Sequence, residues 1–326
     1  MRKHIKITGL GIYNPENQVE NDYYLEHFKK QGRDITNLLT VLGREKRHII
    51  DNNHENSLTM GIEAAKKALE DAGIKGKDVD MIIFASQCPE YTLPTNAAFL
   101  HNAISADNHT IIFDTNAACA GMTIAVETAS RYMLSNKRVN RALVVGSDAN
   151  SLISNPEQEI TYASFADGAA AIILEKTEEE TGFIDAVHYL DSTKRENILY
   201  PPKGFSKSNG EKEYIDFKPF DGTPSIMIAC EMIEEFLAEN GLTIDSVDAL
   251  CLSQFAVSNI EIMQKHFEIA AEKILYAGDE VGYTSTSSPF FALNKGIENG
   301  QIKRGDTVLF WTVGAGDEMI AMLFKY

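Results

Sequence analysis

The feature that most restricts the fold of this chain is a pattern of elements that occurs twice. Residues 69–74 read as the end of a helix with a glycine stop, and residues 79–84, after a short loop, read as a buried strand. Residues 237–242 and 247–252 repeat the same order without a gap. The first copy and the second therefore predict the same local structure.

A second pair of segments repeats in the same way. The apolar runs 141–146 and 169–174 have counterparts at 306–311 and 318–323. The separation between copies stays near half of the 326 residues. Chance similarity between two βα units is the alternative, but the repeated order of several elements favours a duplicated α/β fold. We expect an N-terminal half over residues 1–176 and a C-terminal half over residues 177–326.

Helical and strand patterns alternate within each half. Residues 58–72 show helical periodicity, and strands such as 79–85 are continuous apolar runs. Continuous apolar strands are typical of sheets covered on both faces, so we expect mostly parallel sheets flanked by helices. The polar stretch 203–220 contains glycine, proline and several Ser and Lys residues, and predicts a long loop that borders an entrance.

Cys119 has surroundings that can produce a nucleophile. The apolar run 111–113 leads into residues 114–122, which read as a strand that delivers one cysteine to the first turn of a helix. Amides and dipoles at a helix N-terminus favour an anion, so we expect this thiol to lose its proton more readily than a free cysteine. Small neighbours leave room for a substrate carbonyl. The alternative is a buried cysteine that only packs.

Charge and composition exclude several classes of function. The 30 Lys and Arg residues face 47 Asp and Glu residues, a net charge of −17, which argues against non-specific binding to nucleic acid or anionic membranes. No long apolar segment is present, so we expect a soluble, cytoplasmic protein. The cysteines at 88, 119, 230 and 251 lack metal-ligand spacing, which favours reduced thiols over disulfides or a zinc site. We expect neither a metal nor another cofactor.

Several motifs, taken in order, resemble those of the thiolase-fold condensing enzymes, specifically the ketoacyl-acyl-carrier-protein synthase III group. The resemblance covers nearly the whole chain. The motifs lie at residues 7–15, 43–49, 114–121, 165–170 and 314–316. The resemblance implies a thiolase-like, five-layered α-β-α-β-α arrangement of two halves, usually as a homodimer.

The same resemblance implies a set of site residues. Cys119 is implied as the acyl acceptor, and the backbone N–H groups of Cys119 and Ala315 as an oxyanion hole for the thioester oxygen. Leu93 occupies the position from which family members send a residue into the partner's pocket. Phe165, Gly314 and Gly316 are further candidates for substrate contacts, although core packing explains Phe165 equally well.

Two motifs depart from the family at the positions that stabilise an enolate. The family's His-Gln-Ala-Asn segment is Ser253-Gln254-Phe255-Ala256 here, and its Gly-Asn-Thr-Ser segment is Gly282-Tyr283-Thr284-Ser285. Each lost donor is worth on the order of 3 kcal/mol in the transition state, so we expect decarboxylative condensation to be slow. Ser253 and Tyr283 either donate weaker hydrogen bonds or only pack, and Asn259 is another candidate donor. Acyl transfer to Cys119 survives these changes.

The surfaces that recruit substrate in the family also differ. Asn37 and Val41 stand where relatives grip the adenine and phosphate of coenzyme A. Arg44 and Arg47 remain nearby, and either hold a phosphate by charge-assisted hydrogen bonds or belong to a solvated basic turn.

The helix that presents Lys and Arg to acyl carrier protein in relatives has lost its basic character in this chain. It carries Thr223 and Met227, followed by Glu231, Glu234 and Glu235. We therefore expect an acyl carrier protein, if it is a partner, to dock differently from the ordinary mode of the family.

Three functions agree with these residues. The first is an acyltransferase, or divergent condensing enzyme, that loads an acyl group from acyl-CoA or acyl carrier protein onto Cys119 and transfers it in fatty-acid-like or specialised-metabolite biosynthesis. The second is a non-catalytic or half-catalytic partner subunit of a heteromeric condensing enzyme. The third keeps acylation of Cys119 but ends in hydrolysis or in ester or amide formation.

Overall fold

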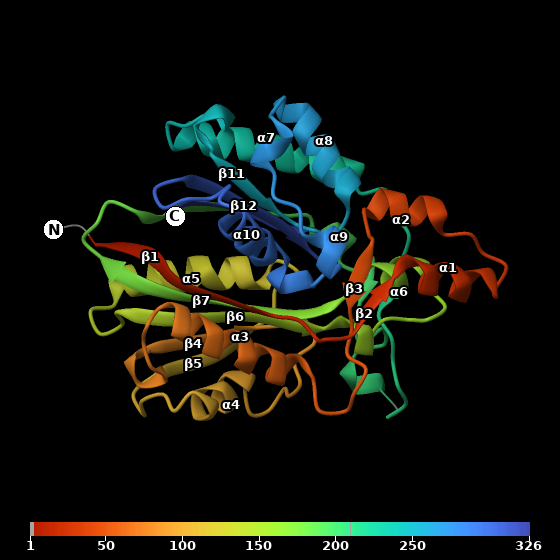
Figure 1. The fold of residues 1–326 in the computed structure, drawn as a ribbon, viewed down its shortest axis with the longest axis horizontal. Coiled ribbons are helices and arrows are strands. Elements are labelled where there is room, and N and C mark those ends of the chain that lie inside the picture. The colour runs from red at the N-terminus through yellow and green to blue at the C-terminus, as the bar shows by residue number, and fades with distance from the viewer. Residues whose placement is uncertain (1–2, 209) are drawn as a thin grey trace.

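Helices and sheets alternate in five layers (Figure 1). The computed structural model describes residues 3–208 and 210–326. One outer layer consists of α3 (Ser57–Asp71) and α4 (Asn96–Ala103), and the other of α7 (Thr223–Glu239) and α8 (Val257–Phe267). Between the two sheets lie α5 (Gly121–Ser135) and α10 (Ser288–Glu298). This arrangement confirms the predicted α-β-α-β-α fold.

The first sheet has five strands in an order that differs from the chain order. Its strands are β1 (His4–Tyr13), β7 (Asp167–Thr177), β6 (Arg141–Ala149), β4 (Met81–Ala85) and β5 (Ile111–Thr115), named here as neighbours across the sheet. Only β6, β4 and β5 run parallel, whereas β7 is antiparallel to both β1 and β6.

The second sheet has the same order for the corresponding strands. It consists of β11 (Ala249–Leu252), β12 (Thr307–Gly314), β13 (Glu318–Lys325) and β8 (Gly182–Leu190). Here β11 and β12 are parallel, and β13 is antiparallel to both of its neighbours. The repeated segments of the sequence thus occupy matching places, with β4 corresponding to β11, β6 to β12 and β7 to β13. The exact division of the chain at residue 176 stays a prediction.

The expectation of mostly parallel sheets is wrong. Only the three residues 315–317 separate β12 from β13, and so short a connection joins antiparallel neighbours. Helices cover both faces of each sheet, so its inner strands are apolar on both sides whichever way they run. Strand direction is therefore not visible in the apolar pattern.

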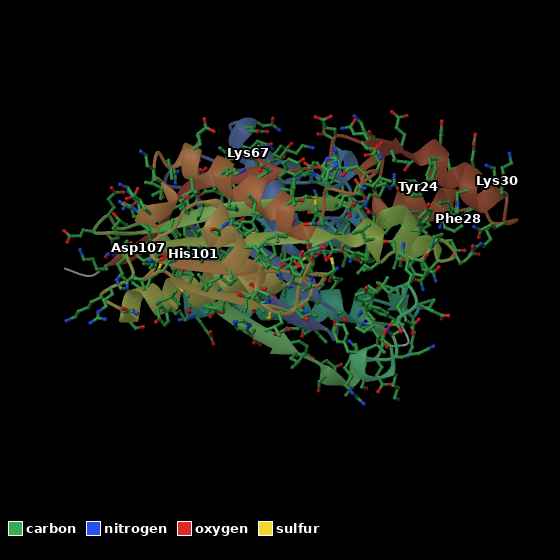
Figure 2. The ribbon with its side chains drawn as sticks, turned by 90° about the horizontal axis from the view of Figure 1, so that it is seen from below. Tyr24, Phe28, Lys30, Lys67, His101 and Asp107 are labelled. Carbon is green, nitrogen blue, oxygen red and sulfur yellow. The ribbon has the colours of Figure 1, made fainter. Side chains whose placement is uncertain are left out.

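The remaining elements form a smaller lobe beside the five layers. Figure 2 shows Tyr24 and Phe28 of its first helix at the end of the molecule away from His101 of α4, and both aromatic side chains are buried there. The region expected to be a loop, 203–220, contains one short strand. The elements are β2 (Gln18–Glu20), α1 (Asn21–Lys29), α2 (Thr36–Leu42), β3 (Lys46–His48), α6 (Glu159–Ser164), β9 (Ile198–Leu199), β10 (Asp216–Phe217) and α9 (Gly278–Val281).

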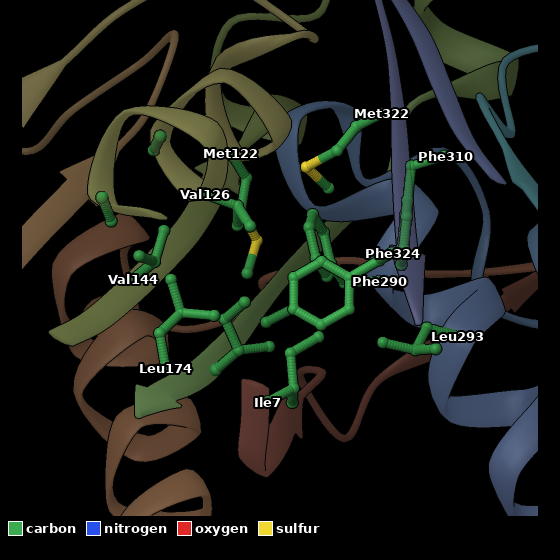
Figure 3. Close-up of a cluster of buried hydrophobic side chains, with 14 of the residues drawn as sticks. Ile7, Met122, Val126, Val144, Leu174, Phe290, Leu293, Phe310, Met322 and Phe324 are labelled. Atoms are coloured by element: carbon green, nitrogen blue, oxygen red, sulfur yellow. The ribbon is translucent and has the colours of Figure 1, made fainter. Parts of the chain in front are cut away.

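The central helices form the main core (Figure 3). Because α5 lies between two sheets, it is apolar around most of its circumference. Met122 and Val126 of α5 are fully buried and pack in one cluster with Phe290 of α10 and Phe310 of β12. Burial of each such side chain contributes roughly 1.5–3 kcal/mol. This packing holds the first turn of α5, and with it the residues just before, in a fixed position.

A close approach between α5 and β6 depends on one glycine. A Cβ atom on Gly146 would lie 2.7 Å from the sulfur of Met122, so a larger residue would push the helix away from the sheet. Within the described residues, no helix is long and apolar enough to cross a membrane.

Candidate active site

A cavity of about 230 Å³ brings together residues that are far apart in the sequence. Cys119 lines it after β5, and Tyr283 lines it from the segment before α10. Gly314 lines it from the end of β12, and Ala315 and Gly316 line it from the turn between β12 and β13. The structure thus gathers most of the site residues that the sequence singles out.

The turn that carries Cys119 is tight and needs small residues. The amides of Ala120 and Gly121 donate to the carbonyls of Ala117 and Ala118 over 3.0 Å, and Ala118 has a φ of 46°. A Cβ atom on Gly314 would lie 2.7 Å from the carbonyl oxygen of Ala117. The two loops that face the cavity therefore touch each other directly.

Besides Tyr283, two polar side chains approach the sulfur of Cys119. The Oγ atom of Ser285 lies 3.1 Å from Sγ, and the Oε1 atom of Gln87 accepts from the thiol over 3.6 Å. Neither residue is a candidate from sequence reasoning. Ser285 directly follows the altered Tyr283 motif, and Gln87 follows the carboxyl end of β4, next to the strand that leads to Cys119. These positions are the signal that could have identified them.

The environment of Cys119 disfavours a free thiolate. Burial raises the pKa of the Cys119 thiol, and hydrogen bonds from the hydroxyls of Ser285 and Tyr283 lower that pKa only in part. The expectation of a lowered pKa is therefore wrong. The helix begins at Gly121, two residues after the cysteine, and loss of water around the sulfur outweighs the favourable hydrogen bonds.

Tyr283 and Ser253 occupy different positions relative to the cavity. Tyr283 lines it and is only 2% exposed, and burial raises the pKa of its phenol well above the ordinary value. Ser253 is buried, and its Oγ forms no ordinary hydrogen bond with the described residues. Asn259 lines the cavity from α8. Of the three candidate donors, the Tyr283 phenol and the Asn259 amide therefore line the cavity, and Ser253 does not.

Phe165 and Leu93 contrast in their placement. Phe165 lines the cavity, and its ring centroid lies 5.8 Å from that of Tyr283. Leu93 is 87% exposed and does not line the cavity of its own chain. Contact of Leu93 with a partner's pocket stays a prediction.

Arg44 and Arg47 are not presented to a phosphate, and that expectation is wrong. Both side chains are buried. Arg44 donates to the carbonyls of Gln254 and Phe255 over 2.6 Å and 2.7 Å. Arg47 donates to the carbonyl of Ala163 over 2.7 Å and stacks on a tyrosine ring. The alternative of a solvated basic turn is wrong too, because both guanidinium groups tie loops together inside the protein.

A buried carboxylate organises the loops around the cysteine. Asp148, at the end of β6, accepts hydrogen bonds from the amide of Gln87 over 2.8 Å and from the amide of Thr286 over 3.1 Å. Burial raises the pKa of Asp148, whereas these hydrogen bonds lower it. The residue therefore holds the segments that carry Gln87 and Ser285, and an acidic residue shortly after the apolar run 142–146 is its sequence signal.

The described residues contain no group of three or more His, Cys, Asp or Glu side chains that could hold a metal ion.

Comparison with known proteins places these features in context. Two family models match the chain: 3-oxoacyl-[acyl-carrier-protein] synthase III over residues 113–192, and the C-terminal part of the same enzyme over residues 237–326. The beta-ketoacyl-[acyl-carrier-protein] synthase III of Neisseria meningitidis is 30% identical, covering 99% of this chain and 100% of that protein. The corresponding protein of Clostridium perfringens is 29% identical, with 99% of each covered.

Solved structures agree with the sequence matches. The crystal structure of 3-oxoacyl-[acyl-carrier-protein] synthase III from Aquifex aeolicus superposes with a TM-score of 0.86 at 26% identity, covering 99% of this chain and 100% of that one.

Proposed function

Because the chain belongs to the 3-oxoacyl-[acyl-carrier-protein] synthase III family, whose members are acyltransferase-type condensing enzymes, we propose that it accepts an acyl group on Cys119 and transfers it onward. The observation that carries this proposal is the position of the sulfur. Cys119 Sγ borders an apolar cavity, and a hydroxyl lies 3.1 Å away. A thioester substrate, from acyl-CoA or acyl carrier protein, reaches the sulfur through this cavity.

The acylation step exchanges one thioester for another. The sulfur of Cys119 attacks the substrate carbonyl, the bond to the original sulfur breaks, and the departing thiolate takes up the proton that Cys119 loses. The proposed oxyanion hole is formed by the backbone N–H groups of Cys119 and Ala315. Its support is that the loops at Cys119 and Gly314–Gly316 line the same cavity and touch each other. Ser285 donates to the sulfur as negative charge develops there.

The second step differs from decarboxylative condensation. Tyr283 and Ser253 replace the two enolate donors, and Ser253 does not line the cavity. We therefore propose that the acyl group passes to a nucleophile without efficient loss of carbon dioxide. Hydrolysis and ester or amide formation share the same acyl-enzyme and are distinguished by the product. The pathway, fatty-acid-like or specialised, is part of the proposal.

The charge of the outer helix α7 affects how an acyl carrier protein can dock. Glu231, Glu234 and Glu235 are exposed on α7, so this face repels an acidic carrier domain. We propose that a carrier protein, if it delivers the acyl group, docks less tightly here than on a basic helix.

The proposed assembly is a homodimer in which Leu93 enters the partner's pocket. The exposure of this side chain supports the proposal. The alternative role, as a partner subunit of a heteromeric enzyme, stays a prediction.

Intact-mass measurement after incubation with a panel of acyl-CoA and acyl-carrier thioesters tests the proposal. Wild type should gain the mass of one acyl group, and Cys119→Ala should gain none. Cys88→Ala is the matched control, because Cys88 is also a partly buried thiol near Asp148 but does not line the cavity. A wild-type protein that gains no mass from any thioester, or a gain that persists in Cys119→Ala, would sink the proposal.

A further inference from the structure

Aromatic rings form a continuous series along the cavity. The ring of Phe217 lies 5.8 Å from that of Phe220 and 5.9 Å from that of Phe255, with interplanar angles of 15° and 14°. Phe255 in turn meets Tyr283 edge to face, 5.2 Å between centroids. Phe165 adds a further ring 5.8 Å from Tyr283. All five residues line the cavity that contains Cys119.

The series leads from solvent to the reactive sulfur. Phe220 is 45% exposed, whereas Tyr283 is 2% exposed and its hydroxyl interacts with the thiol of Cys119. The rings come from four separate segments: the residue after α6, the end of the 203–220 region, the turn after β11, and the loop before α10. A substrate that reaches the sulfur therefore passes along ring faces and edges contributed by different parts of the chain.

Two of these rings stand where the family motifs have smaller side chains. Phe255 replaces the alanine of His-Gln-Ala-Asn, and Tyr283 replaces the asparagine of Gly-Asn-Thr-Ser. The same substitutions that remove polar groups from the site thus add aromatic surface to it. This coincidence indicates a change in what the cavity accommodates as well as a loss of condensing chemistry.

The cavity offers no free charge to a substrate. Lys194 and Asp317 are the only charged residues that line it within the described part of the chain. They pair with each other over 2.7 Å, and the hydroxyl of Ser225 lies 3.0 Å from both. A carboxylate or ammonium group on the substrate would therefore lose water without gaining an unpaired group of opposite charge.

We infer that the acyl group taken by Cys119 is uncharged and planar, an aryl group or a conjugated polyene. The inference rests on the proposed function and names the substrate class for it. Aliphatic side chains suffice to enclose a flexible alkyl chain. Stacked and edge-on rings also stabilise a flat conjugated group, because aromatic pairs gain free energy beyond the amount that comes from burying apolar area.

A matched pair of thioesters tests the inference. Sorboyl and hexanoyl N-acetylcysteamine thioesters have acyl chains of equal length, but only the first is planar and conjugated. The rate at which each compound acylates Cys119 is divided by the rate at which it transfers its acyl group to the thiol of free glutathione. This ratio removes the difference in intrinsic reactivity between the two thioesters. Wild type should prefer the sorboyl compound, and Phe255→Leu should reduce that preference on the order of 3- to 10-fold. Phe217→Leu is a second variant, and Phe205→Leu, an exposed phenylalanine outside the cavity, is the control.

Calorimetric titration of Cys119→Ala with the same two compounds measures binding without acylation. The expected result is tighter binding of the sorboyl compound and loss of that difference when Phe255→Leu is added. The inference is overturned if neither the acylation rates nor the titration shows a preference for the sorboyl compound. It is also overturned if a preference is present but stays unchanged in Phe255→Leu and Phe217→Leu. If Cys119 reacts with both compounds equally, the proposed function stands and the planar acyl group does not. If nothing acylates Cys119 but Cys119→Ala still discriminates, the proposed function fails, and only the preference of the cavity for a planar conjugated group stands.

The planar group could also belong to the acceptor instead of the acyl donor. Release of a hexanoyl group from Cys119 by aniline and by cyclohexylamine, each corrected for its reactivity with the free hexanoyl thioester, separates the two sources. Discrimination confined to this step assigns the ring to the acceptor and overturns the inference for the acyl group.

Discussion

The hydroxyl oxygen of Ser285 lies 3.1 Å from the sulfur of Cys119, and Ser285 has a left-handed backbone conformation with a φ of 58°. Residues other than glycine seldom adopt this conformation, and it is usually retained only where surrounding contacts enforce it. One such contact is the hydrogen bond that the amide of the next residue, Thr286, donates to buried Asp148. The relationship places a hydroxyl within hydrogen-bond distance of the Cys119 sulfur, in a site where Ser253 stands at the position of the family's histidine.

Replacement of Ser285 should weaken the nucleophile. Burial already raises the pKa of Cys119, and the Ser285 hydrogen bond lowers it, so Ser285→Ala should raise that pKa further. A hydrogen bond worth about 1 kcal/mol corresponds to roughly a 5-fold slower reaction of the thiol with iodoacetamide near pH 7.5. The rate should increase with pH in both proteins, with the curve of the variant displaced to higher pH. Ser287→Ala, which removes a nearby hydroxyl that donates to Thr284, should follow the wild-type curve. Coincident curves for Ser285→Ala and wild type would contradict this role.

Restoring both enolate donors should restore decarboxylation. Tyr283→Asn removes a large buried side chain beside the cavity and leaves space for the imidazole of Ser253→His. Each recovered donor should contribute on the order of 3 kcal/mol to the transition state. Carbon dioxide release from a malonyl thioester should be at background in wild type and rise by at least 100-fold in the double variant. If the double variant folds and is acylated but releases no carbon dioxide, the missing donors are not what limits condensation.

Arg44 should matter for stability and not for phosphate recognition. Its guanidinium donates to several buried carbonyls, and Arg44→Met leaves those acceptors without a donor. We expect a loss of about 3 kcal/mol or more in the free energy of unfolding, measured by urea titration. Arg138→Met, at an exposed position, should change it by less than about 0.5 kcal/mol. A stable Arg44→Met protein that has lost affinity for coenzyme A would reverse our interpretation.

Asp167 should make stability depend on pH. Burial raises its pKa to about 6, although the amide of Ser151 donates to it over 2.8 Å. Because the folded-state pKa lies above that of the unfolded chain, the folded protein binds the extra proton as the pH falls. We therefore compare the free energy of unfolding of wild type with that of Asp167→Asn. The value for wild type minus the value for Asp167→Asn should be about 1 kcal/mol larger at pH 5 than at pH 7. Urea titrations at the two pH values measure it, and a difference independent of pH would refute it.

The local patterns of the sequence were sufficient to predict the layered fold. The repeated helix-glycine-strand pattern predicts helix α3 and strand β4, and their counterparts at the end of α7 and in β11, within two residues of their observed ends. The apolar run before Cys119 likewise predicts β5 and the helix after it. Such predictions succeed because periodicity and glycine stops are properties of a few consecutive residues.

Tertiary structure alone decided the direction of the strands, the burial of the two arginines and the neighbours of the Cys119 sulfur. Strands covered on both faces are apolar in either direction, so the antiparallel β13 could not be told from a parallel strand. Arg44 looks basic and exposed in the sequence, but two of its acceptors are carbonyls about 210 residues away. Ser285 meets Cys119 across 166 residues. Burial and hydrogen bonding depend on which distant segments pack together, and no local pattern records that choice.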